Sequence, residues 1–192
     1  MIKSLALITV AAIGLLLAYA ATRPDSFRVE RSTTVAAPAA KLFPLINDLH
    51  RFNTWNPYNR KDPAMQGTYS GPAAGPGAVF DFQGNKEVGK GRIGITTSTE
   101  PSAVTMQLDM FEPFEGHNVV TFSLVPEGGA TRVTWAMHGP VPYLAKIAHL
   151  VFNMDRMVGQ DFEDVGQKTD FLLHAFQQRT GGIGGVFHPV NR

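Results

Sequence analysis

Three titratable side chains stand where a cavity could use them. Arg31 and Asp81 lie in segments that otherwise read as apolar strands, and His149 neighbours the apolar face of a late helical pattern. A group of this kind, buried beside a bound substrate, can serve as a general acid or base. We therefore treat these residues as the candidates for catalysis, with an ordinary role at a strand edge or on a helix surface as the alternative for each.

Other patterns that resemble cofactor or metal sites are incomplete. Residues 89–94 match G-x-G-x-x-G, but a strand pattern follows them where a dinucleotide-binding loop needs a helix, so we interpret these glycines as turn and bulge positions. The six histidines do not fall at metal-ligand spacing. Asp161, Glu163 and Asp164 fit the solvated face of a helix better than a paired acid and base. The sequence predicts no metal, no cofactor and no assigned catalytic residue, and it leaves open whether the protein is an enzyme.

Composition excludes several classes of protein. The chain has 192 residues, of which 44% are apolar and 17% are charged, so it suits one folded domain of ordinary size rather than a disordered chain. It has no cysteine, which excludes a disulfide scaffold, a thiolate zinc site and a cysteine nucleophile. The 17 Lys and Arg residues nearly balance the 16 Asp and Glu residues, which argues against nucleic acid as a partner.

The first 23 residues differ from the rest of the chain. The run Ser4–Ala21 carries no charge, and as a helix it would be about 27 Å long, close to the hydrocarbon thickness of a bilayer. We expect residues 1–23 to form a transmembrane helix that anchors the protein. A cleaved signal peptide is the alternative, because Ala18-Tyr19-Ala20 has the small-x-small pattern of a cleavage site.

Charges beside this run give opposing indications about the side of the membrane. Lys3 precedes the run, which favours a cytoplasmic N-terminus and an exported domain, whereas Arg23, Arg28 and Arg31 follow it closely. We expect a single-pass membrane protein whose soluble domain is exported to the periplasm or another extracytoplasmic compartment.

Residues 24–178 read as one α+β domain. Alternation of apolar and polar residues predicts a half-buried strand at 26–36 and a series of strands from Val79 to Met137, separated by turn residues. Successive strands that share one apolar face predict an antiparallel meander.

Helical spacing of apolar residues appears before and after this series of strands. It predicts a short helix after Pro38 and a longer closing segment at 143–178. Residues 50–77 are rich in turn formers and read as irregular, and the Gly-rich residues 179–192 read as a flexible tail.

The order of these elements and several short segments resemble the START-like (SRPBCC) superfamily, near its polyketide cyclase/dehydrase-like branch. The likeness covers about residues 26–165. The segments that carry it are Val35-Ala36-Ala37-Pro38, Leu45-Ile46-Asn47-Asp48-Leu49, Trp55-Asn56-Pro57, Gly91-Arg92-Ile93, Gly129-Ala130-Thr131-Arg132-Val133-Thr134-Trp135 and Asn153-Met154-Asp155.

This resemblance implies a helix-grip (START/Bet v-like) fold, in which a curved antiparallel sheet surrounds a long C-terminal helix, here preceded by the transmembrane helix. It also implies a cavity that holds a hydrophobic or lipid-like molecule. We predict a membrane-anchored domain that binds such a molecule without catalysis. The alternatives are a polyketide cyclase/dehydrase-like enzyme that uses general acid–base catalysis, and a co-chaperone-like protein-interaction domain with an exposed apolar patch.

Aromatic and methionine side chains on the strand faces are the main candidates for ligand contacts. They suit an adaptable apolar pocket, and an ordinary core packed against the closing helix is the alternative. The predicted ligand-binding residues are Trp55, Tyr58, Phe80, Phe82, Met106, Phe122, Trp135, Met137, Ile147 and Val151.

Overall fold

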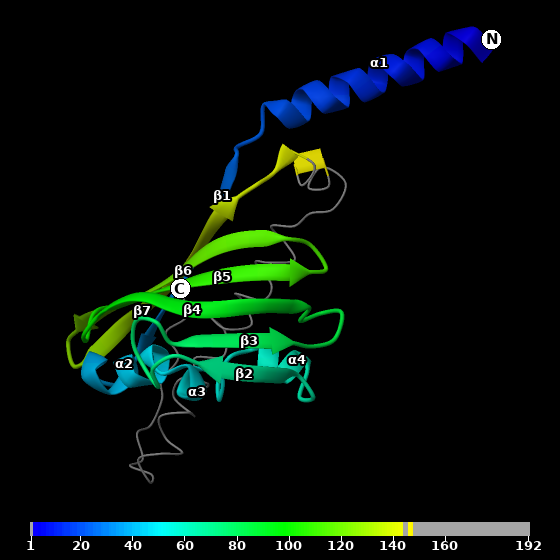
Figure 1. Ribbon diagram of the computed structural model, residues 1–192. Helices are drawn as coiled ribbons and strands as arrows, with labels where there is room; N and C mark the ends of the chain where they lie inside the picture. The colour runs from blue at the N-terminus through cyan, green and yellow to red at the C-terminus, as the bar shows by residue number, and fades with distance from the viewer. Residues whose placement is uncertain (1, 144–145, 148–192) are drawn as a thin grey trace.

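The computed structural model describes residues 2–143 and 146–147, and these residues form one curved seven-stranded antiparallel sheet (Figure 1). The strands lie in the order β1-β7-β6-β5-β4-β3-β2. Their bounds are β1 Ser26–Val35, β2 Gln66–Ser70, β3 Val79–Gln83, β4 Lys90–Thr99, β5 Ala103–Glu112, β6 Gly116–Glu127 and β7 Ala130–Pro140. The predicted antiparallel meander is therefore confirmed, and β1 closes one edge of the sheet by pairing with β7.

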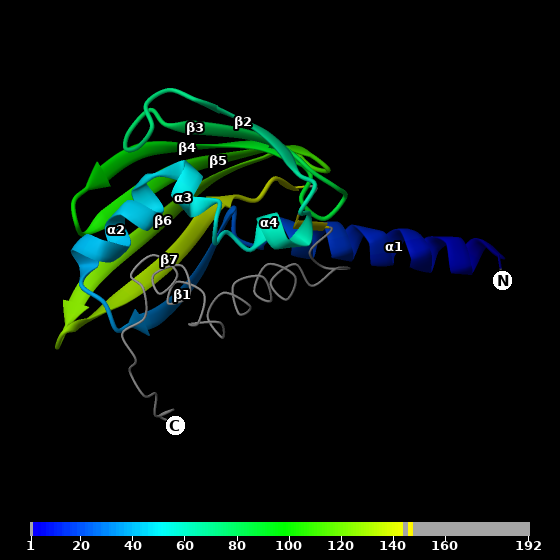
Figure 2. The same cartoon turned by 90° about the horizontal axis from the view of Figure 1, so that it is seen from below.

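Helices lie before β1 and between β1 and β2. Their bounds are α1 Ile2–Ala21, α2 Ala39–Asn47, α3 Leu49–Phe52 and α4 Tyr58–Lys61. The sheet curves around α2 and α3, which lie against its concave face, whereas α1 extends away from it (Figure 2). We call the concave face the inner face, and we call the opposite face the outer face.

Alternate residues of each strand point to the inner face and form rows across the sheet. In one row Met106 lies opposite Ile95 on one side and Val120 on the other. In the next row Phe122 lies opposite Val104 and Trp135. Because apolar side chains fill these rows, folding removes a continuous apolar surface from water.

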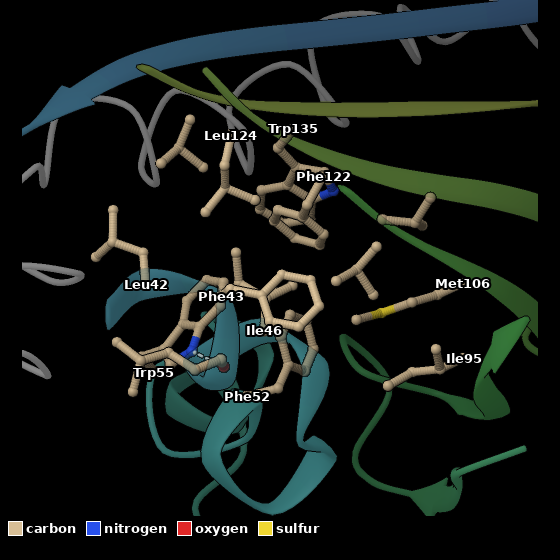
Figure 3. Close-up of a cluster of buried hydrophobic side chains, with 14 of the residues drawn as sticks. Leu42, Phe43, Ile46, Phe52, Trp55, Ile95, Met106, Phe122, Leu124 and Trp135 are labelled. Carbon is tan, nitrogen blue, oxygen red and sulfur yellow. Dashed lines mark hydrogen bonds between the residues drawn. The ribbon is translucent and has the colours of Figure 1, made fainter. Parts of the chain in front are cut away.

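A cluster of buried aromatic and aliphatic side chains fills the space where α2 and α3 pack on the sheet (Figure 3). Phe122 packs with ring centroids 5.9 Å from Phe52, 6.0 Å from Trp55 and 5.4 Å from Trp135. Trp55 is itself buried, and its indole Nε1 donates a hydrogen bond to the carbonyl oxygen of Leu45 (2.9 Å). This hydrogen bond gives the indole N–H of Trp55 a partner, while the rest of the side chain packs in the hydrophobic core.

Residues 50–77 are more ordered than the sequence predicts. Asp48 caps α3, because its Oδ1 accepts hydrogen bonds from the backbone N–H groups of His50 (2.9 Å) and Arg51 (3.2 Å). Strand β2 forms the edge of the sheet, and every residue in it is exposed, so it has no alternation of apolar and polar residues to reveal it.

The N-terminal helix is confirmed as a helix, since α1 covers the predicted apolar run. No helix in the part of the chain that the structure describes meets the length and apolarity of a membrane span. The predicted closing segment at 143–178 and the tail at 179–192 lie outside the described residues, apart from Tyr143, Lys146 and Ile147.

Helix α1 is tied to the segment that follows β7. The hydroxyl of Tyr143 donates a hydrogen bond to the carbonyl oxygen of Leu17 (2.8 Å). Lys146, whose side chain is only 5% exposed, donates through Nζ to the carbonyl oxygen of Arg23 (2.8 Å) and forms an ion pair with Asp25. The end of α1 and the linker before β1 are therefore joined directly to the segment after β7.

Candidate ligand-binding site

Burial along the inner face changes from one end of the sheet to the other. Val104, Phe122 and Leu124 are almost completely buried beneath α2 and α3. Several apolar side chains nearer the end where α1 joins β1 are only partly buried: Phe27, Val29, Phe82 and Leu108. We call this the α1 end of the sheet, where β1, β4 and β6 begin and β3, β5 and β7 end. The inner face therefore combines a filled core with an apolar surface that could contact a ligand.

Arg31 and Asn118 are among the polar side chains on this face. Arg31 shares the inner parity of β1 and lies opposite Trp135, and its Nη1 donates a hydrogen bond to the carbonyl oxygen of Glu30 (2.9 Å). Asn118 lies opposite Leu108, a position that its shared parity with Val120 and Phe122 could have revealed from the sequence. The inner face thus offers polar groups that could orient a ligand, and the sequence reasoning identified only one of them.

Gly139 makes room for the amide of Asn118. A Cβ atom at Gly139 would lie 2.1 Å from Asn118 Oδ1 and 3.0 Å from the carbonyl oxygen of His117. A side chain at this position would have to push the Asn118 amide aside, because β6 and β7 approach each other closely here.

Asp81 does not face the inner side of the sheet. It alternates with Phe80 and Phe82 and lies opposite Arg92 on the outer face. Its carboxylate accepts two hydrogen bonds from this arginine, from Nε at 2.6 Å and from Nη2 at 3.2 Å. The interpretation of Asp81 as a cavity group is therefore wrong, while His149, the third candidate for catalysis, lies outside the described residues.

A hollow of about 270 Å³ opens beside α4, at the β2 edge of the sheet. Aromatic rings form one of its walls. Tyr69 stacks on Phe80 with ring centroids 4.5 Å apart, and His50 stacks on Tyr69 at 3.6 Å. The Phe80 ring lies over Gly67, where a Cβ atom would come within 2.1 Å of the ring. The residues lining the hollow are Asn59, Asp62, Pro63, Met65, Gly67, Tyr69 and Phe80.

The polar residues that line the hollow differ in how many of their side-chain oxygen and nitrogen atoms have a hydrogen-bond partner. Asp62 Oδ1 accepts a hydrogen bond from the backbone N–H of Ala64 (3.0 Å), and its Oδ2 accepts one from Asn85 (2.6 Å). Asn59 donates through Nδ2 to the carbonyl oxygen of Asn53. Its Oδ1 is buried and has no hydrogen-bond partner within the described part of the molecule. Asp62 therefore fixes the loop, whereas Asn59 keeps an unused acceptor.

The structure divides the predicted ligand-binding residues into groups. Phe80 lines the hollow, Tyr58 belongs to the neighbouring α4, and Phe82 and Ile147 are partly buried. Val151 lies outside the described residues. The members that are buried in or beside the filled core are Trp55, Met106, Phe122, Trp135 and Met137.

Of the residues that line the hollow, the sequence reasoning identified only Phe80. Asn59, Met65 and Tyr69 fall in the segment that reads as irregular. Their proximity depends on the pairing of β2 with β3, which places Tyr69 opposite Phe80. No spacing within the segment itself signals this arrangement.

A polar pair on the outer face gives the folded protein a dependence on pH. His117 Nδ1 lies 2.7 Å from Asp109 Oδ1, and this hydrogen bond raises the pKa of His117 above its usual value. The same bond, together with one from Gln107, lowers the pKa of Asp109. The stabilisation that His117 gives the folded state is complete below the usual histidine pKa, and it is lost as the pH rises through the raised pKa of His117. The aspartate contribution is present above its usual pKa and is lost as the pH falls through the lowered value.

We expect His117→Gln to lower the melting temperature most at a pH of about 5.5, below the usual histidine pKa, and progressively less as the pH rises through the raised pKa of His117. The measurement is thermal unfolding followed by circular dichroism across this range at low salt, since both groups are near the surface and salt screens such pairs. His138→Gln, a change of another exposed outer-face histidine on β7, is the control. A pH-independent effect of His117→Gln would contradict the assignment.

The sequence matches a known protein family over most of its length. A family model described as polyketide cyclase / dehydrase and lipid transport matches residues 26–165. A search of curated proteins gave no significant match.

Solved structures share the fold at low sequence identity. An uncharacterised protein from Rhizobium leguminosarum has a TM-score of 0.56 and 12% identity, with 80% of this chain and 96% of that chain covered. Protein MLL2253 from Mesorhizobium loti has a TM-score of 0.54 and 15% identity, with 80% and 98% covered. The Aha1 dimer from Colwellia psychrerythraea has a TM-score of 0.51 and 17% identity, with 82% and 99% covered. At these identities the likeness concerns the fold.

Proposed function

Because the chain belongs to the polyketide cyclase/dehydrase and lipid transport family, we propose that it binds a hydrophobic or lipid-like small molecule on the inner face of its sheet, without catalysing a reaction. The observation that carries this proposal is the loss of burial toward the α1 end, where Phe27, Val29 and Leu108 are only partly covered. A soluble domain gains stability by burying such surface, so a face that stays partly open suits a bound molecule.

Apolar contact would supply most of the affinity. A ligand that removes about 200 Å² of apolar surface from water gains about 5 kcal/mol before the costs of association and ordering are subtracted. Arg31 and Asn118 would then set the orientation of the molecule through polar contacts.

The alternative of a polyketide cyclase/dehydrase-like enzyme needs a general acid or base beside the ligand. Asp62 lines the hollow, but both of its carboxylate oxygens accept backbone hydrogen bonds, which suits a role in holding the loop. Asp81 pairs with Arg92 on the other side of the sheet. These contacts favour the binding proposal over the catalytic one.

The experiment that tests the binding function is recovery of the native ligand. We expect mass spectrometry of the full chain, purified in mild detergent, to reveal an apolar small molecule at near-stoichiometric amount after denaturation. A parallel preparation of an unrelated protein in the same detergent is the control for adventitious lipid. A ligand-free chain that also fails to take up Nile red would contradict the proposal.

We further propose that α1 anchors the protein in a membrane and that the domain is exported. This proposal is supported by the uncharged run Ser4–Ala21 and by exposed apolar side chains such as Val10 (68% exposed) and Leu15 (73% exposed). Phe111 near the end of β5 and Phe114 in the turn that follows add exposed apolar surface at the α1 end of the sheet.

We expect the full chain to stay in the membrane pellet after alkaline carbonate extraction and to retain residues 1–23 in its intact mass. Substituting both Val10→Arg and Ile13→Arg should release it, because each charge near a helix centre costs about 2.5–3.5 kcal/mol on insertion. Thr22→Arg, outside α1, is the control. A mature chain that begins at about residue 21 or 22 would instead support the cleaved signal peptide.

A further inference from the structure

Asn118 places an amide on the inner face of β6, where the positions that follow it are Val120, Phe122 and Leu124. We infer that this amide is the anchor for the head group of the bound molecule. The ligand class that fits it is an apolar molecule whose uncharged head group both donates and accepts a hydrogen bond, such as a primary amide or a protonated carboxylic acid. This inference rests on the proposed binding function and names the head group that the inner face selects.

The position of Asn118 coincides with the partly buried part of the inner face. It lies opposite Leu108 on β5, and on its other side lies Gly139 of β7, which is opposite Phe27 on β1. Leu108 and Phe27 are both only partly buried. The amide therefore lies in the row of the sheet on which the proposed ligand packs.

The amide is unpartnered but accessible. Within the described part of the chain, the side chain of Asn118 forms no hydrogen bond. The residue is only partly buried, and neither its Oδ1 nor its Nδ2 is completely buried. Asn59 differs in this respect, since its unpartnered Oδ1 is buried and out of reach of a ligand. The acceptor and the donor of Asn118 are therefore both available to a bound molecule.

Folding alone does not explain an amide at this position. A polar group without a partner on an apolar surface costs the folded state free energy, and a leucine of nearly the same size would continue the apolar row. Departures of this kind from the apolar pattern are typical of functional sites. By contrast, the amide of Gln107 on the outer face donates to Asp109 Oδ1 (3.0 Å), so it has a structural partner.

Two glycines leave room around the amide. A Cβ atom at Gly139 would lie 2.1 Å from Oδ1 of Asn118, and one at Gly116 would lie 3.7 Å from its Nδ2. The oxygen therefore lies over β7, and the nitrogen lies on the side of Gly116, at the start of β6. Because neither glycine carries a side chain, these positions do not obstruct a head group that approaches the amide.

The neighbours of Asn118 favour an uncharged head group. The inner-face positions next to it are Leu108, Gly116, Val120 and Gly139, and none of them carries a charge. A carboxylate here would lose its hydration without gaining a cation, which is strongly unfavourable. An uncharged head group is desolvated at lower cost, and hydrogen bonds to Asn118 replace those that it made to water.

Two cations near the inner face do not change this expectation. Arg31 lies four residues from Phe27 along β1, which is about 13 Å at the usual rise of a strand. Lys146 is already paired with Asp25. Arg31 is therefore too far away to neutralise an anionic head group held by Asn118, and Lys146 is already engaged.

The test compares decanamide with undecane, an apolar chain of similar length, on the full chain in mild detergent. Displacement of Nile red gives each affinity, with the free probe concentration corrected for uptake by protein-free micelles. We expect Asn118→Leu to weaken decanamide binding by about tenfold or more, as loss of hydrogen bonds in an apolar site does, and to change undecane binding by less than about threefold. Gln107→Leu, which removes an amide from the outer face, should leave both affinities unchanged.

Two further measurements complete the test. At a pH of about 8, decanoate should bind the wild type at least about tenfold more weakly than decanamide, because it is an anion under these conditions. Without ligand, Asn118→Leu should melt at the same temperature as the wild type or higher, since its amide has no hydrogen bond to lose. Asn118→Ala, which is smaller, separates loss of the amide from crowding against β7.

The outcomes separate this inference from the binding function. Equal effects of Asn118→Leu on decanamide and undecane, or decanoate binding as tight as decanamide binding, would overturn the inference while the binding function stands. Early melting of both Asn118→Leu and Asn118→Ala would also overturn it, because the amide would then support the fold. A wild type that takes up neither Nile red nor either probe would remove the binding function itself.

Discussion

Replacing Phe122 by alanine is expected to lower the free energy of unfolding by about 3–5 kcal/mol, the range found for large-to-small changes of buried aromatic residues. The side chain is only 1% exposed and contacts the rings of Phe52, Trp55 and Trp135. Because helices α2 and α3 pack on this residue, the cavity left behind cannot collapse without moving them. The measurement is denaturant unfolding of the detergent-solubilised chain, followed by tryptophan fluorescence.

The matched control for this prediction is Val125→Ala on the same strand. Val125 points to the outer face and is 52% exposed, so its truncation should change the free energy of unfolding by no more than about 0.5 kcal/mol. A loss below about 1 kcal/mol for Phe122→Ala would mean that the packing around this ring is loose. Such a result would favour a ligand cavity at the centre of the sheet over one at the α1 end.

Placing a charge on the partly buried part of the inner face should weaken ligand binding. We expect Leu108→Lys to weaken uptake of Nile red by about tenfold or more, because an ammonium group beside the ligand must either lose its hydration or displace the ligand. Leu108 is only partly buried, so the protein should tolerate the lysine better than the buried Met106 would. Fluorescence titration of the full chain measures the effect.

Thr105→Lys is the control, since it adds the same charge to the outer face of the same strand. Circular dichroism melting should show that both variants are folded at the temperature of the titration. Equal uptake by Leu108→Lys and the wild type would place the ligand away from this end of the sheet and contradict the proposed site.

The strands that have one buried face were readable from the sequence. In β6, Val120, Phe122 and Leu124 are buried and alternate with Thr121 and Ser123, so the pattern of residue types repeats the pattern of burial. Strand β2 could not be predicted in this way, because all of its residues are exposed and its sequence has no alternation of apolar and polar residues.

The candidate site was partly readable for the same reason. Alternation placed Phe80 and Phe82 on the inner face, and the same alternation should have placed Asp81 on the outer face, opposite Arg92. Asn59 and Tyr69 could not be found in this way, since the chain brings them together through loops and an edge strand. The periodicity of apolar residues therefore predicts well which strand residues face inward. It predicts poorly which residues line the hollow, because loops and an edge strand bring those residues together.

Helix α1 is not connected to the domain by a linker alone. Tyr143 forms a hydrogen bond with Leu17 in α1, and Lys146 forms one with Arg23 just after the helix. A flexible linker would let the domain reorient freely relative to α1. These hydrogen bonds instead restrict the angle between the helix axis and the sheet. If α1 stands in a bilayer, the exposed Phe114 in the turn between β5 and β6 would lie near the membrane surface, because this turn and α1 are at the same end of the sheet. A hydrophobic ligand would then move between the bilayer and the protein over a short distance, with little exposure to water.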